Sequence, residues 1–313
     1  MATLVGGITT SHVPAIGRAI AKNLQADPYW KPFFDGYAPV HRWLDTEARP
    51  DVVVVVYNDH GLNFFLDKMP TFAVGAAAEY RNADEGWGIP QLPAFTGEQD
   101  LSWHLIESLA GEDFDLTTCQ EMVVDHAFTL PMALLWPSPE EAKGRSRASE
   151  LPSGGGPARS DGPGGSGYWP VKVVPVCINT VQFPLPSAKR CYALGEAIGR
   201  AVRSWPSDQR VLVLGTGGLS HQLDGQRAGF INKDFDLAFM ESLVHDPRWA
   251  TQFSIHELVE KTGTQGVELL MWLTARAALG EGPVRRVHQN YHIPISNTAS
   301  GLMVLAPQWV LSS

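Results

Sequence analysis

The sequence predicts a single α/β domain with a central mixed sheet flanked by helices, and two observations carry this prediction. Short apolar runs rich in β-branched residues are typical of buried strands. They alternate along the chain with longer segments in which apolar residues recur every three or four positions, as they do in helices. The length of 313 residues suffices for one large α/β domain or for two smaller ones.

The order of the predicted elements supports one continuous domain over residues 1–313. Strands are expected at 3–8, 52–57, 71–74, 171–178, 211–214 and 301–305, and helices at 101–110, 193–205, 235–244 and 266–279. Alternating strands and helices build a largely buried sheet. The stretch 137–168 differs, because Gly, Pro, Ser and charged residues dominate it. We interpret it as a flexible surface insertion within the domain.

Composition argues against several classes of function. The formal charge is −9 and Lys and Arg are not clustered, so we expect no nucleic-acid partner. The three cysteines lack the spacing of a disulfide framework or a zinc ribbon. The N-terminus has no basic flank before an apolar stretch, and no apolar run is long enough to span a bilayer. We therefore expect a cytoplasmic protein without a membrane partner.

Four histidines follow predicted strands, and the first case is DVVVVVYNDH at 51–60. Asn58 and Asp59 are common turn residues, whereas His60 fits a turn or a functional site equally well. The other three are His12 in TTSHVP, His126 in VDHA after a predicted strand at 115–124, and His221 in GTGGLSHQ. Ligands gather at the carboxyl ends of strands in α/β sheets, so the four imidazoles predict a pocket suited to a metal.

The glycine-rich segment at 215–222 and the run around Glu268 complete the candidate site. The segment lacks the pattern of a phosphate-binding loop, so we interpret its glycines as a tight turn that brings His221 near a ligand. Glu268 lies in the apolar run VELLMW, either on a solvated stripe or buried with a partner. Two imidazoles and a carboxylate form the facial triad of non-haem Fe(II) oxygenases, although zinc accepts the same ligands.

Eight motifs in this order resemble the class III extradiol ring-cleaving dioxygenases. They are SHVPAIG at 11–17, VYNDH at 56–60, ADEGWG at 83–88, VDHA at 124–127, GTGGLSHQ at 215–222, RAGFINKDFD at 227–236, GVELLMW at 266–272 and YHIPISNTA at 291–299. The resemblance is strongest to the β subunit of protocatechuate 4,5-dioxygenase, with gallate dioxygenase near it. It covers nearly the whole chain except 137–168.

The resemblance implies a role for individual residues. It implies Fe(II) ligands at His12, His60 and Glu268, an active-site base at His221, a second pocket histidine at His126, and substrate-carboxylate contacts at Ser296 and Asn297. The implied reaction is extradiol cleavage of a carboxylated catechol by O₂. Protocatechuate 4,5-cleavage is expected first, with gallate or 3-O-methylgallate as the alternative. A zinc hydrolase and a non-catalytic binding protein on the same fold stay open as hypotheses of other classes.

The resemblance also bears on assembly. In relatives the catalytic chain pairs with a small helical α subunit or carries an equivalent extension. This chain ends soon after LMVLAPQWV at 302–310, so we expect no such extension. A separate α subunit or a homo-oligomer is expected instead.

Overall fold

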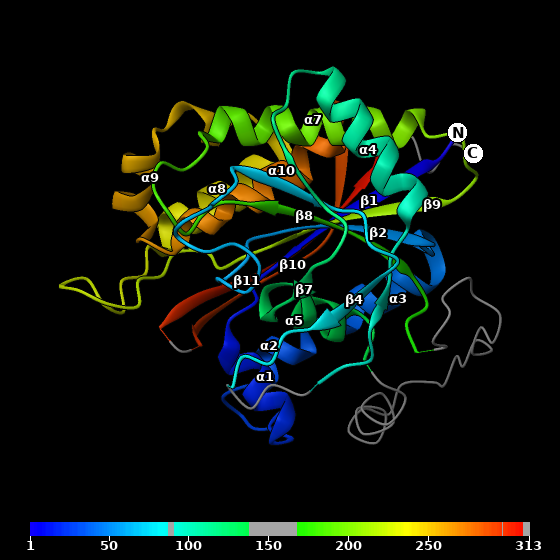
Figure 1. Ribbon diagram of the computed structural model, residues 1–313. Helices are drawn as coiled ribbons and strands as arrows, with labels where there is room; N and C mark the ends of the chain where they lie inside the picture. The colour runs from blue at the N-terminus through cyan, green and yellow to red at the C-terminus, as the bar shows by residue number, and fades with distance from the viewer. Residues whose placement is uncertain (87–90, 138–167, 296, 309–313) are drawn as a thin grey trace.

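The computed structural model describes residues 1–86, 91–137, 168–295 and 297–308. Nearly all of the predicted insertion, 138–167, lies outside these described residues, and so does Ser296. The described chain forms three layers, in which a twisted sheet separates two groups of helices (Figure 1). Within it, no helix has the length and apolar character that a membrane span requires.

The helices and strands are bounded as follows. The helices are α1 (Pro14–Ala21), α2 (Lys31–Asp35), α3 (Ala38–Trp43), α4 (Gln99–Gly111), α5 (His126–Leu135), α7 (Ala188–Ser204), α8 (Lys233–His245), α9 (Ile255–Thr262) and α10 (Leu269–Ala278). The strands are β1 (Thr3–Thr10), β2 (Val52–Tyr57), β3 (Phe72–Gly75), β4 (Glu79–Asn82), β5 (Phe95–Thr96), β6 (Thr117–Cys119), β7 (Val123–Val124), β8 (Lys172–Ile178), β9 (Arg210–Thr216), β10 (Val284–Ile295) and β11 (Thr298–Pro307).

The main sheet is mixed, with the strand order β10-β11-β1-β9-β2-β8-β3-β6. Its four central strands, β1, β9, β2 and β8, are parallel. On the two sides of this group, β11 pairs antiparallel with β1 and β3 pairs antiparallel with β8. The predicted α/β class, with a mixed central sheet and flanking helices, is confirmed. Because β1, β9 and β2 run parallel, the loops that follow them leave the sheet at the same edge.

The valine run in β2 is buried on both faces, as its composition predicts. Val52, Val54 and Val56 enter the core formed with α4, α7, α8 and α10, while Val53 and Val55 enter the core formed with α1, α2, α3 and α5. Each valine is fully buried. Burying one such side chain contributes about 1.5–3 kcal/mol relative to leaving it exposed. The strand is therefore a firm support for the loop at its carboxyl end.

The structure departs from the sequence prediction at the margins of the sheet. β10 is not predicted because its sequence, VRRVHQNYHIPI, is largely polar, which suits its place at the sheet edge. The predicted strand at 115–124 is divided into β6 and β7, which belong to different sheets. The predicted helix at 266–279 begins instead as a 3₁₀ turn, Gly266–Glu268, before α10. This change of helix type places Glu268 at the N-cap of α10.

Candidate metal centre

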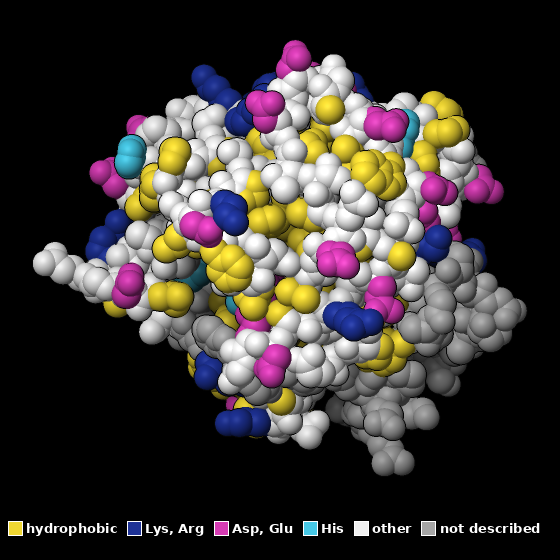
Figure 2. Space-filling model, viewed as in Figure 1, with side chains coloured by type: hydrophobic (Ala, Val, Ile, Leu, Met, Phe, Trp, Pro, Cys, Tyr) yellow, Lys and Arg dark blue, Asp and Glu magenta, His cyan; other side chains and the backbone are white. Residues whose placement is uncertain are grey.

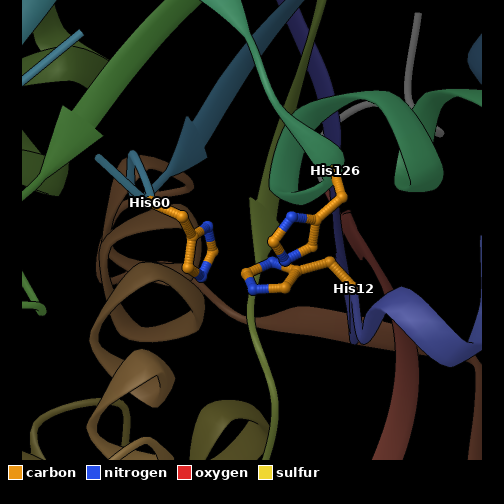
Figure 3. Close-up of side chains that lie close together, drawn as sticks. All are labelled: His12, His60 and His126. Carbon is orange, nitrogen blue, oxygen red and sulfur yellow. The ribbon is translucent and has the colours of Figure 1, made fainter. Parts of the chain in front are cut away.

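The histidines that follow three parallel strands lie at one edge of the sheet. His12 follows β1, His60 follows β2 and His221 follows β9. His126 reaches the same place differently, as the first residue of α5. Figure 3 shows the rings of His12, His60 and His126 turned toward one another. The pocket of imidazoles that the sequence predicts is therefore present in the fold.

The four imidazoles share one mode of attachment, because each is held through Nδ1. The partners of Nδ1 are Thr216 Oγ1 at 3.2 Å for His12, Asp125 Oδ2 at 3.0 Å for His60, Glu85 Oε1 at 2.7 Å for His126, and the Leu219 carbonyl at 2.9 Å for His221. A carboxylate or a carbonyl can only accept, so Nδ1 donates in the last three cases. In the neutral ring, Nε2 then carries the free lone pair.

Glu268 supplies a carboxylate to two of these rings. Its Oε2 lies 3.4 Å from Nε2 of His12, and its Oε1 lies 3.7 Å from Nε2 of His60. The backbone N–H of Gly218 donates to Oε2 at 2.7 Å, and Asn58 Nδ2 donates to Oε1 at 3.4 Å. The Glu268 side chain is only 7% exposed. Of the two alternatives that the sequence left open for Glu268, the structure has the buried carboxylate with partners.

The donor set suits a divalent metal ion. Ligand bonds of about 2.0–2.2 Å place neighbouring ligand atoms about 3–4 Å apart, which matches the spacing of Glu268 from His12 and His60. A second set is also compact, since ring nitrogens of His12, His60 and His126 lie within 4.8 Å of one another. Both sets share His12 and His60. The carboxylate set adds an anionic ligand, which offsets the charge of the cation.

The pKa values in the cluster follow from this crowding of charge. Burial alone would lower the pKa of His60, but the carboxylates of Asp125 and Glu268 raise it to about 10. Burial lowers the pKa of His12 despite the nearby Glu268. Burial alone would raise the pKa of Glu268, yet the imidazoles of His12, His60 and His221 hold it well below its usual range. Glu268 is therefore ionised and ready to act as an anionic ligand.

Asp125 supports the imidazole of His60, a contact that the sequence does not reveal. Its Oδ2 accepts from both the backbone N–H (2.8 Å) and Nδ1 (3.0 Å) of His60, while its Oδ1 caps α5 by accepting from the Ala127 N–H at 3.0 Å. The imidazole of His60 and the N–H groups facing Asp125 lower its pKa to about 2, although burial opposes this. The only sequence signal was its place beside His126 in VDHA.

Replacing Asp125 with asparagine tests this support. Asparagine is also a good N-cap, so α5 should stay intact, but its single carbonyl oxygen cannot match the carboxylate behind His60. We expect metal affinity to fall about 10–100-fold, as for other partners that orient a metal-binding histidine. Chelator competition measures the affinity, with Glu241→Gln on α8 as an exposed control. An unchanged affinity together with an unchanged melting temperature would contradict this role.

Glu85 plays the corresponding part for His126 and was likewise not singled out in the sequence. Its two carboxylate oxygens accept from the backbone N–H and from Nδ1 of His126, each at 2.7 Å. The ring of His126 packs 4.3 Å from that of His60 and 5.5 Å from that of His12, centroid to centroid. Glu85 belongs to the ADEGWG motif, which carried the resemblance without a role for its glutamate. It fixes the direction in which Nε2 of His126 points.

The glycines before His221 allow the close approach that the sequence predicted. A side chain on Gly218 would place its Cβ 2.3 Å from Cε1 of His221, and Gly217 has φ of +153° beside Glu268. The loop is held on its other side by Asp236, a buried carboxylate whose two oxygens accept from the backbone N–H and the hydroxyl of Ser220 at 2.9 and 2.6 Å. These contacts hold the imidazole of His221 beside the candidate metal ligands His12, His60 and Glu268.

A cavity of about 900 Å³ opens over the cluster. Its lining includes His12, His60, His126, His221 and Glu268. Thr298 also lines it, but its neighbour Asn297 is exposed, has φ of +57° and is not among the described lining residues. The cavity lining thus brings together the predicted metal ligands and the two histidines predicted to be catalytic, but it does not include Asn297. Ser296 is outside the described residues.

Comparison with known proteins points to the same family as the sequence motifs. The family model of the catalytic LigB subunit of aromatic ring-opening dioxygenase matches residues 6–301. Gallate dioxygenase from Pseudomonas putida is 35% identical over 212 residues, which cover 68% of this chain and 54% of that protein. The chain therefore spans about half the length of this relative.

Two further comparisons extend over nearly the whole chain. A 2,3-dihydroxyphenylpropionate/2,3-dihydroxicinnamic acid 1,2-dioxygenase from Photorhabdus laumondii is 26% identical, with 96% of each protein covered. The crystal structure of an uncharacterized protein from Escherichia coli K12 has a TM-score of 0.57 at 14% identity, covers 96% of this chain and 99% of that one, and shares the fold. The predicted resemblance is confirmed, and the chain belongs to the family of catalytic LigB subunits of aromatic ring-opening dioxygenases.

Proposed function

We propose that this chain binds Fe(II) through His12, His60 and Glu268 and cleaves a carboxylated catechol with O₂ at a bond beside the diol. One observation carries the proposal: two imidazole Nε2 atoms and a buried carboxylate converge beneath an open cavity, with two more histidines on its wall. This is the donor set of the facial triad, which leaves positions open for substrate and oxygen. Family membership supports the same reaction class.

The proposed reaction needs a metal ion to bind the reactants and side chains to transfer the proton. When bound, ferrous iron would supply a Lewis-acidic centre with open positions, at which catechol and dioxygen are brought together. His221 accepts the proton of a catechol hydroxyl at Nε2, because its Nδ1 is committed to the Leu219 carbonyl. The same nitrogen returns that proton when the ring opens. His126, held by Glu85, directs Nε2 toward the space between His12 and His60, where substrate and oxygen meet.

The substrate is proposed to be an acidic catechol, with protocatechuate as the first candidate. Ser296 and Asn297 are proposed to contact its carboxylate, as in the proteins that the chain resembles. Gallate is the second candidate, supported by the 35% identity with gallate dioxygenase. Both compounds place a carboxylate across the ring from a catechol diol, so either one could bind at the same metal site.

An oxygen-uptake assay with anaerobically Fe(II)-loaded protein tests the proposal. Protocatechuate, gallate and 3-O-methylgallate are compared, and the products are identified by mass and absorbance. We expect one O₂ consumed per ring-opened product with at least one of the three substrates. Zinc-dependent hydrolysis without oxygen uptake would instead assign a hydrolase. Absence of both turnover and catechol binding would reject the proposal.

A further inference from the structure

An arginine lies in the wall of the cavity that opens over the proposed metal ligands. Arg18 is the only Lys or Arg among the described residues that line this cavity. It lies on α1, one helical turn beyond Pro14, and α1 begins just after His12. Residues four apart share a face of a helix, and both Pro14 and Arg18 line the cavity. The position of Arg18 is therefore tied to that of a proposed metal ligand through one short helix.

The guanidinium of Arg18 has no partner within the described part of the chain. It forms no ion pair there and its side chain makes no hydrogen bond there, although Asp84 and Asp224 line the same cavity. The buried Arg276 differs, because it donates to the carbonyls of Leu243 and Gly280. Arg18 is instead exposed and lines the cavity, so its donors are accessible to a ligand. A planar fork of donors fits a carboxylate bidentately.

The electrostatic setting makes this one charge decisive. Without Arg18, the formally charged residues of the described lining, apart from the histidines, would be Asp84, Glu85, Asp224 and Glu268, all acidic. On the face shown in Figure 2, Lys and Arg side chains lie singly among acidic ones, with no broad basic surface. The net charge is −9, so the molecule as a whole does not attract anions. A cation in the cavity wall therefore favours an anionic substrate over a neutral one.

We infer that Arg18 is a specificity-determining residue that binds the carboxylate of the aromatic substrate and orients its diol toward the proposed metal site. This inference rests on the proposed function and assigns one recognition contact within it. Apolar side chains of Val181, Phe183 and Leu223 line the same cavity and are available to the ring. Arg18 supplies the charge that distinguishes a carboxylated catechol from a neutral one.

The test compares substrates that differ in charge, using full-length protein loaded with Fe(II). Binding of protocatechuate and of neutral 4-methylcatechol is titrated anaerobically, so that no turnover is needed. For Arg18→Ala we expect about tenfold weaker binding of protocatechuate, or about 1.4 kcal/mol, and unchanged binding of 4-methylcatechol. Arg18→Lys should recover part of the loss. Lys22→Ala, an exposed cation one turn farther along and not in the described lining, is the matched control.

The kinetic counterpart separates this inference from the proposed function. In oxygen uptake, Arg18→Ala should raise KM for protocatechuate about tenfold while kcat changes less than about twofold. Equal losses with both catechols, or no loss with either, would overturn the role of Arg18 while ring cleavage by the wild type still stands. If the wild type cleaves no catechol, the function fails, and the binding titrations still decide whether Arg18 recognises the carboxylate.

Discussion

Glu268→Gln is expected to abolish metal loading and ring cleavage while leaving the fold intact. Glutamine keeps the shape and can still accept from the Gly218 N–H, but it removes the negative charge that faces His12 and His60. Loss of an outer partner of a metal ligand already costs about 10–100-fold in affinity, so loss of the anionic ligand itself should cost more. Metal content after anaerobic Fe(II) reconstitution and oxygen uptake are the measurements.

A matched glutamate controls for this change. Glu260→Gln alters an exposed residue on α9 and should keep full metal and full activity. Circular dichroism of the Glu268 variant should match that of the wild type, because glutamine fills the same buried space and its carbonyl oxygen can still accept from the Gly218 N–H. Glu268→Gln protein with full iron and full turnover would show that another residue, such as His126, completes the ligand set.

His221→Phe should retain the metal and lose most of the turnover. Phenylalanine has a similar ring but offers no nitrogen, so the proton of the catechol hydroxyl has no acceptor at this position. General acid–base catalysis contributes about 10²–10⁴-fold, and we expect kcat to fall within that range. Iron content should be unchanged, because His221 stands at the rim and His12, His60 and Glu268 remain. Iron analysis and steady-state oxygen uptake together report both properties.

The opposite pattern would contradict the assignment of His221. A variant that lost iron and activity in parallel would place His221 among the ligands rather than at the proton-transfer step. His245→Phe, on the exposed side of α8, controls for replacement of a histidine by an aromatic ring. Anaerobic catechol binding by His221→Phe should persist, which separates loss of chemistry from loss of substrate.

The central strands of this fold could be predicted from local sequence, because strands buried on both faces consist of apolar, β-branched residues. The valine run of β2 has no alternative to a strand covered on both faces, and His60 follows directly from its end. The margins could not be predicted in this way. β10 is stabilised by pairing with β11 along its length. Its polar residues do not indicate a strand by themselves, so this pairing could not be predicted from them.

The candidate site shows the same division. His12, His60 and His221 follow predicted strands, so their convergence could be anticipated from topology. Asp125 and Glu85 could not be assigned, because each acts through a histidine that only the folded chain brings into place. Glu268 stands at a 3₁₀-to-α transition, and an apolar helical pattern does not reveal which way its carboxylate points.

We propose that three side chains distant in the sequence, those of His12, His60 and Glu268, hold one metal ion. Anomalous diffraction at the iron absorption edge, on crystals of anaerobically Fe(II)-loaded protein, tests it most directly. We predict one strong peak bonded to Nε2 of His12, Nε2 of His60 and the carboxylate of Glu268, with His221 and His126 beyond bonding distance. A peak ligated by His126 in place of Glu268, or no peak among these residues, would show that this ligand set is wrong.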